Sequence, residues 1–119
     1  MLDVELDAFS GRPNPRWELT TAQAAEFWDR IRRLRPTIQD GQVRGEGLGY
    51  RGFVVRPTGE PVGGFDHVTL YRGTVLVQVR DRTERFSDPN RGLERWLLDS
   101  ARGQVSESVL SHIQPEIGR

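Results

Sequence analysis

The chain lacks cysteine and lysine, and it has no long apolar run. Without cysteine there is no disulfide framework, no thiolate metal site and no cysteine nucleophile, which suits a reducing compartment. No stretch approaches the ~20 apolar residues that a membrane-spanning helix needs. Residues 1–5 have neither the basic nor the apolar region of a signal peptide. We therefore expect a cytoplasmic protein without a membrane partner.

Charge and histidine content argue against two further classes of protein. The net charge is zero, because 17 arginines balance 17 acidic residues. A nucleic-acid-binding surface usually needs a basic excess, so we expect no nucleic-acid partner. His67 and His112 are far apart in sequence and have no partner at zinc-ligand spacing. The alternating carboxylates Asp3, Glu5 and Asp7 are more typical of an exposed strand face than of a cation site. We expect neither a metal nor a cofactor.

Length and hydrophobic pattern predict a single α+β domain over residues 1–119. The alternation of charged and apolar side chains over residues 3–9 predicts a half-buried strand, and residues 17–19 could extend it or form a short strand paired with it. Thr20 and Gln23 have the spacing of a capping box, which predicts that a helix begins here. Apolar residues then recur at helical spacing, and we expect Pro36 to stop the helix.

The second half of the chain predicts strands first and helices afterwards. Residues 53–55 form a strand core, and residues 67–71 and 74–80 predict a tight hairpin. Helices are expected over residues 88–103 and 105–114. This order predicts a small mixed or mainly antiparallel sheet of about four strands, with two or three helices packed on one face.

The segment from Phe9 to Trp17 is the leading candidate for a binding site. Pro13 and Pro15 fix their own φ angles and restrict the residues before them, so this connector is stiff. A rigid connector can hold the side chains around it at a set spacing. It therefore suits the presentation of several groups to one ligand.

Polar and aromatic groups of this segment would complement a peptide that ends in a carboxylate. Arg12 and Arg16 would present guanidinium forks to the carboxylate if both point one way. Asn14 offers a donor and an acceptor to a peptide backbone, and Phe9 and Trp17 could wall an aromatic pocket. The alternative is that the two aromatic residues belong to the core and that the prolines shape a tight connection.

Glycines recur at short intervals over residues 41–52. The segment lacks the Lys-Ser/Thr ending of a phosphate loop and precedes a strand, so it does not predict a nucleotide site. We expect the segment to be a mobile lid or a backbone surface for a ligand, or else a long disordered loop. Tyr50 and Arg51 could form further walls of the candidate pocket.

Two other classes of function stay open at this point. Asp66 and His67 could serve a small hydrolase or isomerase, although a turn residue beside a strand edge is the favoured interpretation. The chain could also be a structural dimerisation module, and a homodimer would cover an open sheet edge. Of these classes, a protein without catalytic residues is the favoured prediction.

Two runs carry a resemblance to a known family: FSGRPNPRWEL over residues 9–19 and LGYRGF over residues 48–53. They resemble motifs of small uncharacterised proteins from myxobacteria, cyanobacteria and fungi. Among these are peptide-binding accessory proteins of crocagin-type biosynthesis, in which ribosomally made peptides are modified. The resemblance implies a non-catalytic protein that binds a precursor peptide and steers its processing.

Overall fold

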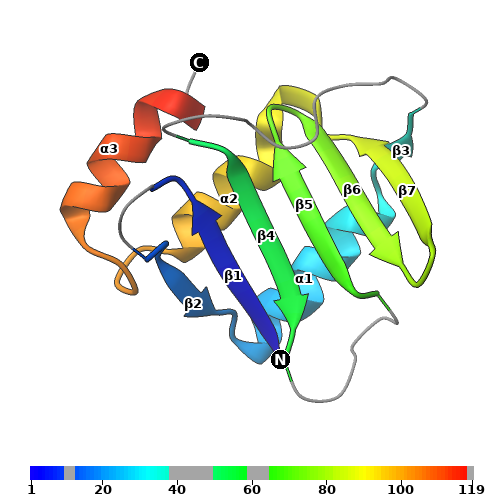
Figure 1. Ribbon diagram of the computed structural model, residues 1–119, viewed down its shortest axis with the longest axis horizontal. Helices are drawn as coiled ribbons and strands as arrows, with labels where there is room; N and C mark the ends of the chain where they lie inside the picture. Colours follow the sequence, from blue (N-terminus) through cyan, green and yellow to red (C-terminus); the bar gives the residue numbers. More distant parts are fainter. Residues whose placement is uncertain (10–12, 38–49, 59–64, 118–119) are drawn as a thin grey trace.

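A computed structural model describes residues 1–9, 13–37, 50–58 and 65–117. Over these residues the chain forms an antiparallel sheet with the strand order β2-β1-β4-β5-β6-β7-β3 (Figure 1). The strands are β1 (Leu2–Asp7), β2 (Arg16–Glu18), β3 (Arg35–Pro36), β4 (Gly52–Pro57), β5 (His67–Tyr71), β6 (Thr74–Val79) and β7 (Arg82–Ser87). The helices are α1 (Thr21–Arg32), a 3-10 turn η1 (Pro89–Arg91), α2 (Gly92–Ser100) and α3 (Glu107–Ile117).

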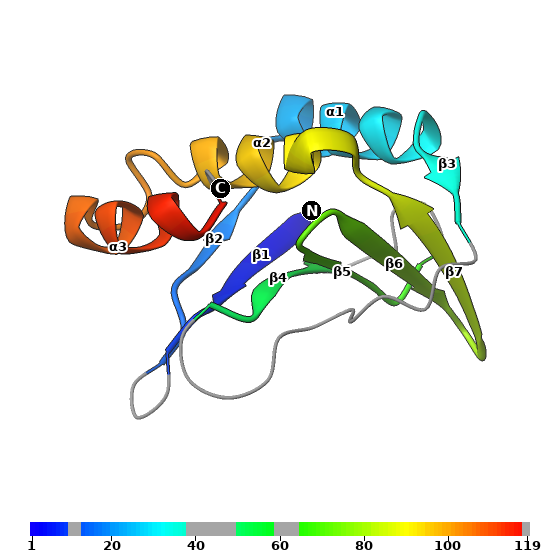
Figure 2. The same cartoon turned by 90° about the horizontal axis from the view of Figure 1, so that it is seen from above.

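The helices α1 and α2 lie side by side over one face of the sheet (Figure 2). Strand β1 shows how the sequence selects this face, because its side chains alternate. Leu2, Val4 and Leu6 are buried in the common core with Phe27 of α1 and Leu97 of α2. The acidic side chains between them lie on the opposite face, which we call the acidic face of the sheet.

The predicted α+β class is confirmed, but the prediction of about four strands is wrong. The described residues form a seven-stranded sheet, and the two strands without any counterpart in the prediction are β3 and β7. Strand β7 has the sequence RTERFS, in which Phe86 is the single large apolar residue. Strand β3 has two residues, one of them Pro36, and it lies at the sheet edge where proline is tolerated. Neither segment has the alternating pattern by which strands are detected.

Helix α1 begins as predicted. The Thr20 hydroxyl accepts a hydrogen bond from the Gln23 N–H at 3.1 Å, and the Gln23 side chain accepts one from the Thr20 N–H at 2.9 Å. The helix ends at Arg32, short of the predicted boundary at Pro36, because Arg35 and Pro36 pair with β7.

The later helices also differ from the prediction at their ends, since α2 covers Gly92–Ser100 and α3 covers Glu107–Ile117. Asp88 caps α2 across the η1 turn, since its carboxylate accepts the N–H groups of Leu93 at 2.9 Å and Glu94 at 3.2 Å. Burial raises the pKa of the Asp88 carboxyl, and the two backbone N–H groups oppose that rise. Helix α3 continues through Pro115 to Ile117, where we had expected Pro115 to end it. Within the described residues, no helix is long and apolar enough to span a bilayer.

Candidate functional site

Asn14, the central residue of the rigid segment, braces the fold. Its side-chain oxygen accepts the backbone N–H groups of Ala8 at 3.2 Å and Phe9 at 3.0 Å. Its amide nitrogen donates to Glu5 at 2.9 Å and to Asp7 at 3.3 Å. Both ends of the amide are therefore engaged within the protein, where they fix the connector against the end of β1.

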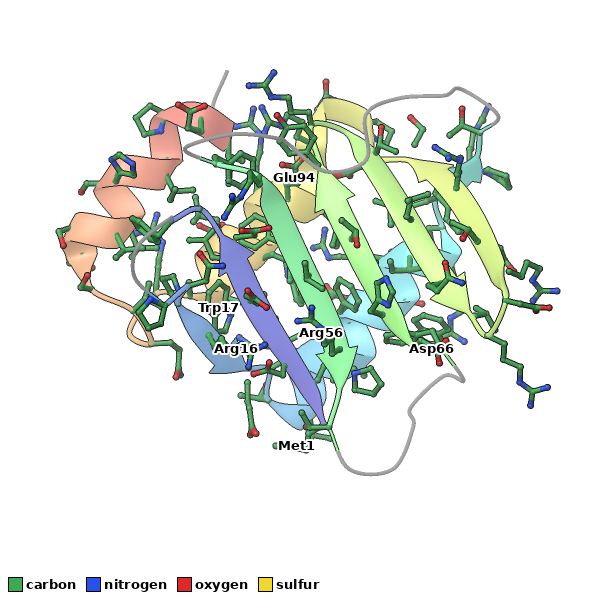
Figure 3. All side chains as sticks on the ribbon, in the orientation of Figure 1. Met1, Arg16, Trp17, Arg56, Asp66 and Glu94 are labelled. Carbon is green, nitrogen blue, oxygen red and sulfur yellow. The ribbon has the colours of Figure 1, made fainter. Side chains whose placement is uncertain are left out.

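Glu5 is the centre of an ion-pair cluster on the acidic face of the sheet, which we call the Glu5 cluster. Its carboxylate accepts hydrogen bonds from Asn14, from Arg16 at 3.1 Å and from Arg56 at 2.8 Å. The two arginines lie on either side of β1 (Figure 3). Partial burial alone would raise the pKa of Glu5, but these three hydrogen bonds and the charge of Arg16 outweigh it and lower the pKa to about 2.

The low pKa of Glu5 predicts an acid-sensitive contribution to stability. The folded state favours the charged carboxylate, so the contribution is present above the unfolded pKa of ~4.3 and is lost as pH falls towards 2. Urea denaturation of wild type and Glu5→Gln at pH 6, 4 and 3 should show a difference in unfolding free energy that shrinks below pH 4. The control Glu18→Gln changes an exposed carboxylate on β2 and should leave that pH dependence unaltered. A constant difference for Glu5→Gln across this range would contradict the assignment.

Arg51 ties the beginning of β4 to the end of β1. Its guanidinium donates to the Asp7 carboxylate, with nitrogen–oxygen distances of 3.0 and 2.8 Å, and to the Phe9 carbonyl at 3.2 Å. Asp7 is only 1% exposed, so this carboxylate needs the cation beside it. The Phe9 ring stacks on His112 of α3, with 6.0 Å between ring centroids.

Trp17 and Tyr50 pack in the hydrophobic core. The Trp17 indole N–H donates to the Ser100 hydroxyl at 2.9 Å, and its ring meets Phe53 edge-on. The Tyr50 ring contacts Phe53 from a second side. These contacts follow the alternative interpretation, in which the aromatic residues around the rigid segment pack the interior.

The hydroxyl of Tyr50 belongs to a buried polar cluster around Glu94, which we call the Glu94 cluster. The Glu94 carboxylate accepts hydrogen bonds from the Tyr50 hydroxyl, from Arg91 at 3.0 and 3.2 Å and from the Gly73 N–H at 2.8 Å. Burial and the neighbouring Glu94 raise the pKa of Tyr50, so its hydroxyl keeps the proton that it donates. The cluster joins the β5–β6 turn to α2.

Arg12 and residues 41–49 of the glycine-rich segment lie outside the described residues. Of the other candidates, the structure brings Phe9, Asn14, Arg16 and Arg51 to β1, and it places Trp17 and Tyr50 in the core. That this set binds a ligand stays a prediction.

Asp66 and His67 occupy a turn and a strand. The Asp66 carboxylate accepts the Arg80 N–H at 3.1 Å, and its own N–H donates to the Gln78 carbonyl at 2.8 Å. His67 is the first residue of β5 and lies opposite Gln78. The described part of the chain shows no hydrogen bond between the two side chains, and it contains no group of three potential metal ligands.

A groove of two adjoining hollows lies along α1 on the described surface. One part is a hollow of about 360 Å³ lined by Leu19, Ala24 and Trp28 among others. The adjoining part is a hollow of about 270 Å³ between α1 and the strands β6 and β7, and its apolar walls include Val77 and Phe86. Trp28 and Arg32 line both hollows, which therefore adjoin, and we call the two together the α1 groove.

Arg32 lines both hollows and was not among the candidates that the sequence predicted. It is exposed, and no ion pair or hydrogen bond engages its side chain within the part of the chain that is described. The residue one turn earlier is Trp28, whose ring stacks on Phe65 at 5.1 Å between centroids. The residue at i−4 from a helical arginine is often acidic and pairs with it. An aromatic residue at that position, as here, is the sequence signal that could have identified Arg32.

Comparisons with protein-family models, with curated protein sequences and with solved structures found no significant match to this chain.

Proposed function

We propose that this protein is a non-catalytic peptide-binding accessory protein and that the α1 groove is its binding site. One observation carries the proposal: two largely apolar hollows lie in line along one helix and share an aromatic ring and a cation. Binding sites are commonly concave and apolar, with few polar groups that set orientation. The α1 groove has this composition.

The length of the groove favours an extended chain over a compact molecule. The residues of α1 that line the hollows run from Thr21 to Arg32, which corresponds to about 16 Å along a helix that rises 1.5 Å per residue. A peptide in extended conformation advances about 3.3 Å per residue, with alternate side chains on one side. Such a peptide would place one apolar side chain in each hollow, with Trp28 between them.

The resemblance of residues 9–19 and 48–53 to peptide-binding helper proteins supports a precursor peptide as the natural ligand. In this proposal the protein holds that peptide while other proteins modify it.

A bulky side chain that fills the α1 groove should weaken peptide binding. A library of random 12-residue peptides, displayed with their C-termini fused, would be selected on the wild-type protein, and enriched peptides would be titrated by calorimetry. Ala25→Trp places an indole in the first hollow and should weaken binding about ten-fold or more, as loss of a buried anchor does.

The matched control is Ala22→Trp. Ala22 is also exposed on α1 but does not line the groove, so this variant has the same helix-propensity cost and should bind within about two-fold of wild type. Enrichment of no peptide, or equal binding by both variants, would overturn the proposed function.

A further inference from the structure

We infer that the α1 groove selects a peptide with an acidic side chain flanked by two apolar side chains, and that Arg32 binds the carboxylate. This inference rests on the proposed function and names the ligand chemistry of the same site. Its basis is the position of one unpaired guanidinium between two apolar hollows.

The neighbouring arginines of α1 show why Arg32 is the available cation. Arg30 pairs with Glu26 at 3.4 Å, and Arg33 pairs with Asp29, each at the i, i+4 spacing of a helical ion pair. Trp28 stands at this spacing before Arg32, and Asp29, three residues before it, pairs with Arg33 instead. Arg32 therefore forms no ion pair with an acidic side chain of the described helix. An exposed cation beside an apolar groove is a ready partner for a carboxylate.

The other charged residues of the groove compensate one another. Arg82 and Glu84 line the second hollow and form an ion pair with 3.1 Å between nitrogen and oxygen. Among the described lining residues, this leaves Arg32 as the side-chain charge without a partner. The groove therefore favours a ligand with negative charge near Arg32.

The position of Arg32 also distinguishes between two sources of that charge. Arg32 borders both hollows, so a carboxylate bound to it has an apolar pocket on either side. A side-chain carboxylate in mid-peptide meets this arrangement, because residues at i−2 and i+2 of an extended chain lie on the same side as residue i. A C-terminal carboxylate would leave one hollow unfilled. The geometry points to an internal aspartate or glutamate.

Selection on three proteins tests the inference. The same C-terminally fused library would be selected on wild type, Arg32→Gln and Arg33→Gln, which lose the same charge at adjacent exposed positions of one helix. Wild type and Arg33→Gln should enrich peptides with Asp or Glu two residues from an apolar residue on each side. Arg32→Gln should still enrich apolar peptides but lose the acidic preference.

Calorimetry on an enriched peptide then separates the outcomes. Replacing its acid by the amide should weaken binding to wild type about five-fold, as expected of an exposed ion pair, and should change little on Arg32→Gln. Equal binding of acid and amide peptides to wild type would overturn this inference and leave peptide binding intact. The amide peptide would also be measured with a free C-terminus. If it then binds as tightly as the acid peptide, Arg32 binds the carboxylate of the chain end, and the inference of an internal acidic side chain is overturned. Failure to enrich any peptide would overturn both proposals.

Discussion

Glu94→Ala should lower the free energy of unfolding by about 3–5 kcal/mol, the usual cost of removing one partner from a buried ion pair. Glu94 is 1% exposed, and its carboxylate accepts four hydrogen bonds from three residues. Its removal leaves the Tyr50 hydroxyl and part of the Arg91 guanidinium buried without acceptors. Since domains of this size are stable by about 5–15 kcal/mol, the variant should be close to unfolding at room temperature.

The control for this prediction is Glu26→Ala. Glu26 is exposed and pairs with Arg30 across one turn of α1, so its loss should change the unfolding free energy by about 0.5 kcal/mol or less. Guanidinium denaturation followed by circular dichroism gives both values. A loss below about 1 kcal/mol for Glu94→Ala would show that the cluster is not desolvated as the structure describes.

Gly52→Ala should be the second strongly destabilising change, with a loss of about 3 kcal/mol or more. Gly52 has a φ of +115°, which L side chains rarely adopt. A methyl group at this position would lie 2.5 Å from the Leu70 carbonyl oxygen, which belongs to the backbone of the adjacent strand β5. Relief of this clash requires a shift of β4 against β5, in the centre of the sheet.

Gly103→Ala isolates the conformational part of that cost. Gly103 also has a positive φ, of +81°, but a methyl group there would meet no atom within 4 Å. It should lose about 1–2 kcal/mol from the unfavourable backbone conformation alone. Thermal unfolding of both variants measures the difference, and equal losses would contradict the close approach of Gly52 to β5.

The parts of the fold that the sequence predicted are those with local signals. The capping box at Thr20 and Gln23 and the hairpin at Arg72 and Gly73 depend on residues close in the chain, and both occur in the structure. Strand β7 was missed because its interior is polar. It pairs along its whole length with β6, so that backbone hydrogen bonding overrides its unfavourable composition.

The candidate site could be predicted less well, because its contacts are distant in sequence. Tyr50 and Glu94 are separated by 44 residues, and no spacing rule relates them. The sequence could not show whether Asn14 faces a ligand or braces the fold, because that depends on the N–H groups of Ala8 and Phe9 turning towards it. The α1 groove depends on β6 and β7 lying beside α1, and only the tertiary fold brings them there.

The proposed binding site is tested most directly by mapping which residues a bound peptide perturbs. An enriched peptide would be titrated into labelled protein, and backbone amide shifts would be followed by nuclear magnetic resonance. The α1 groove predicts the largest shifts at Ala25, Trp28 and Arg32 of α1 and at Val77 of β6. Shifts concentrated instead at Phe9, Asn14 and Arg16 would place the peptide on the rigid segment and contradict binding in the α1 groove.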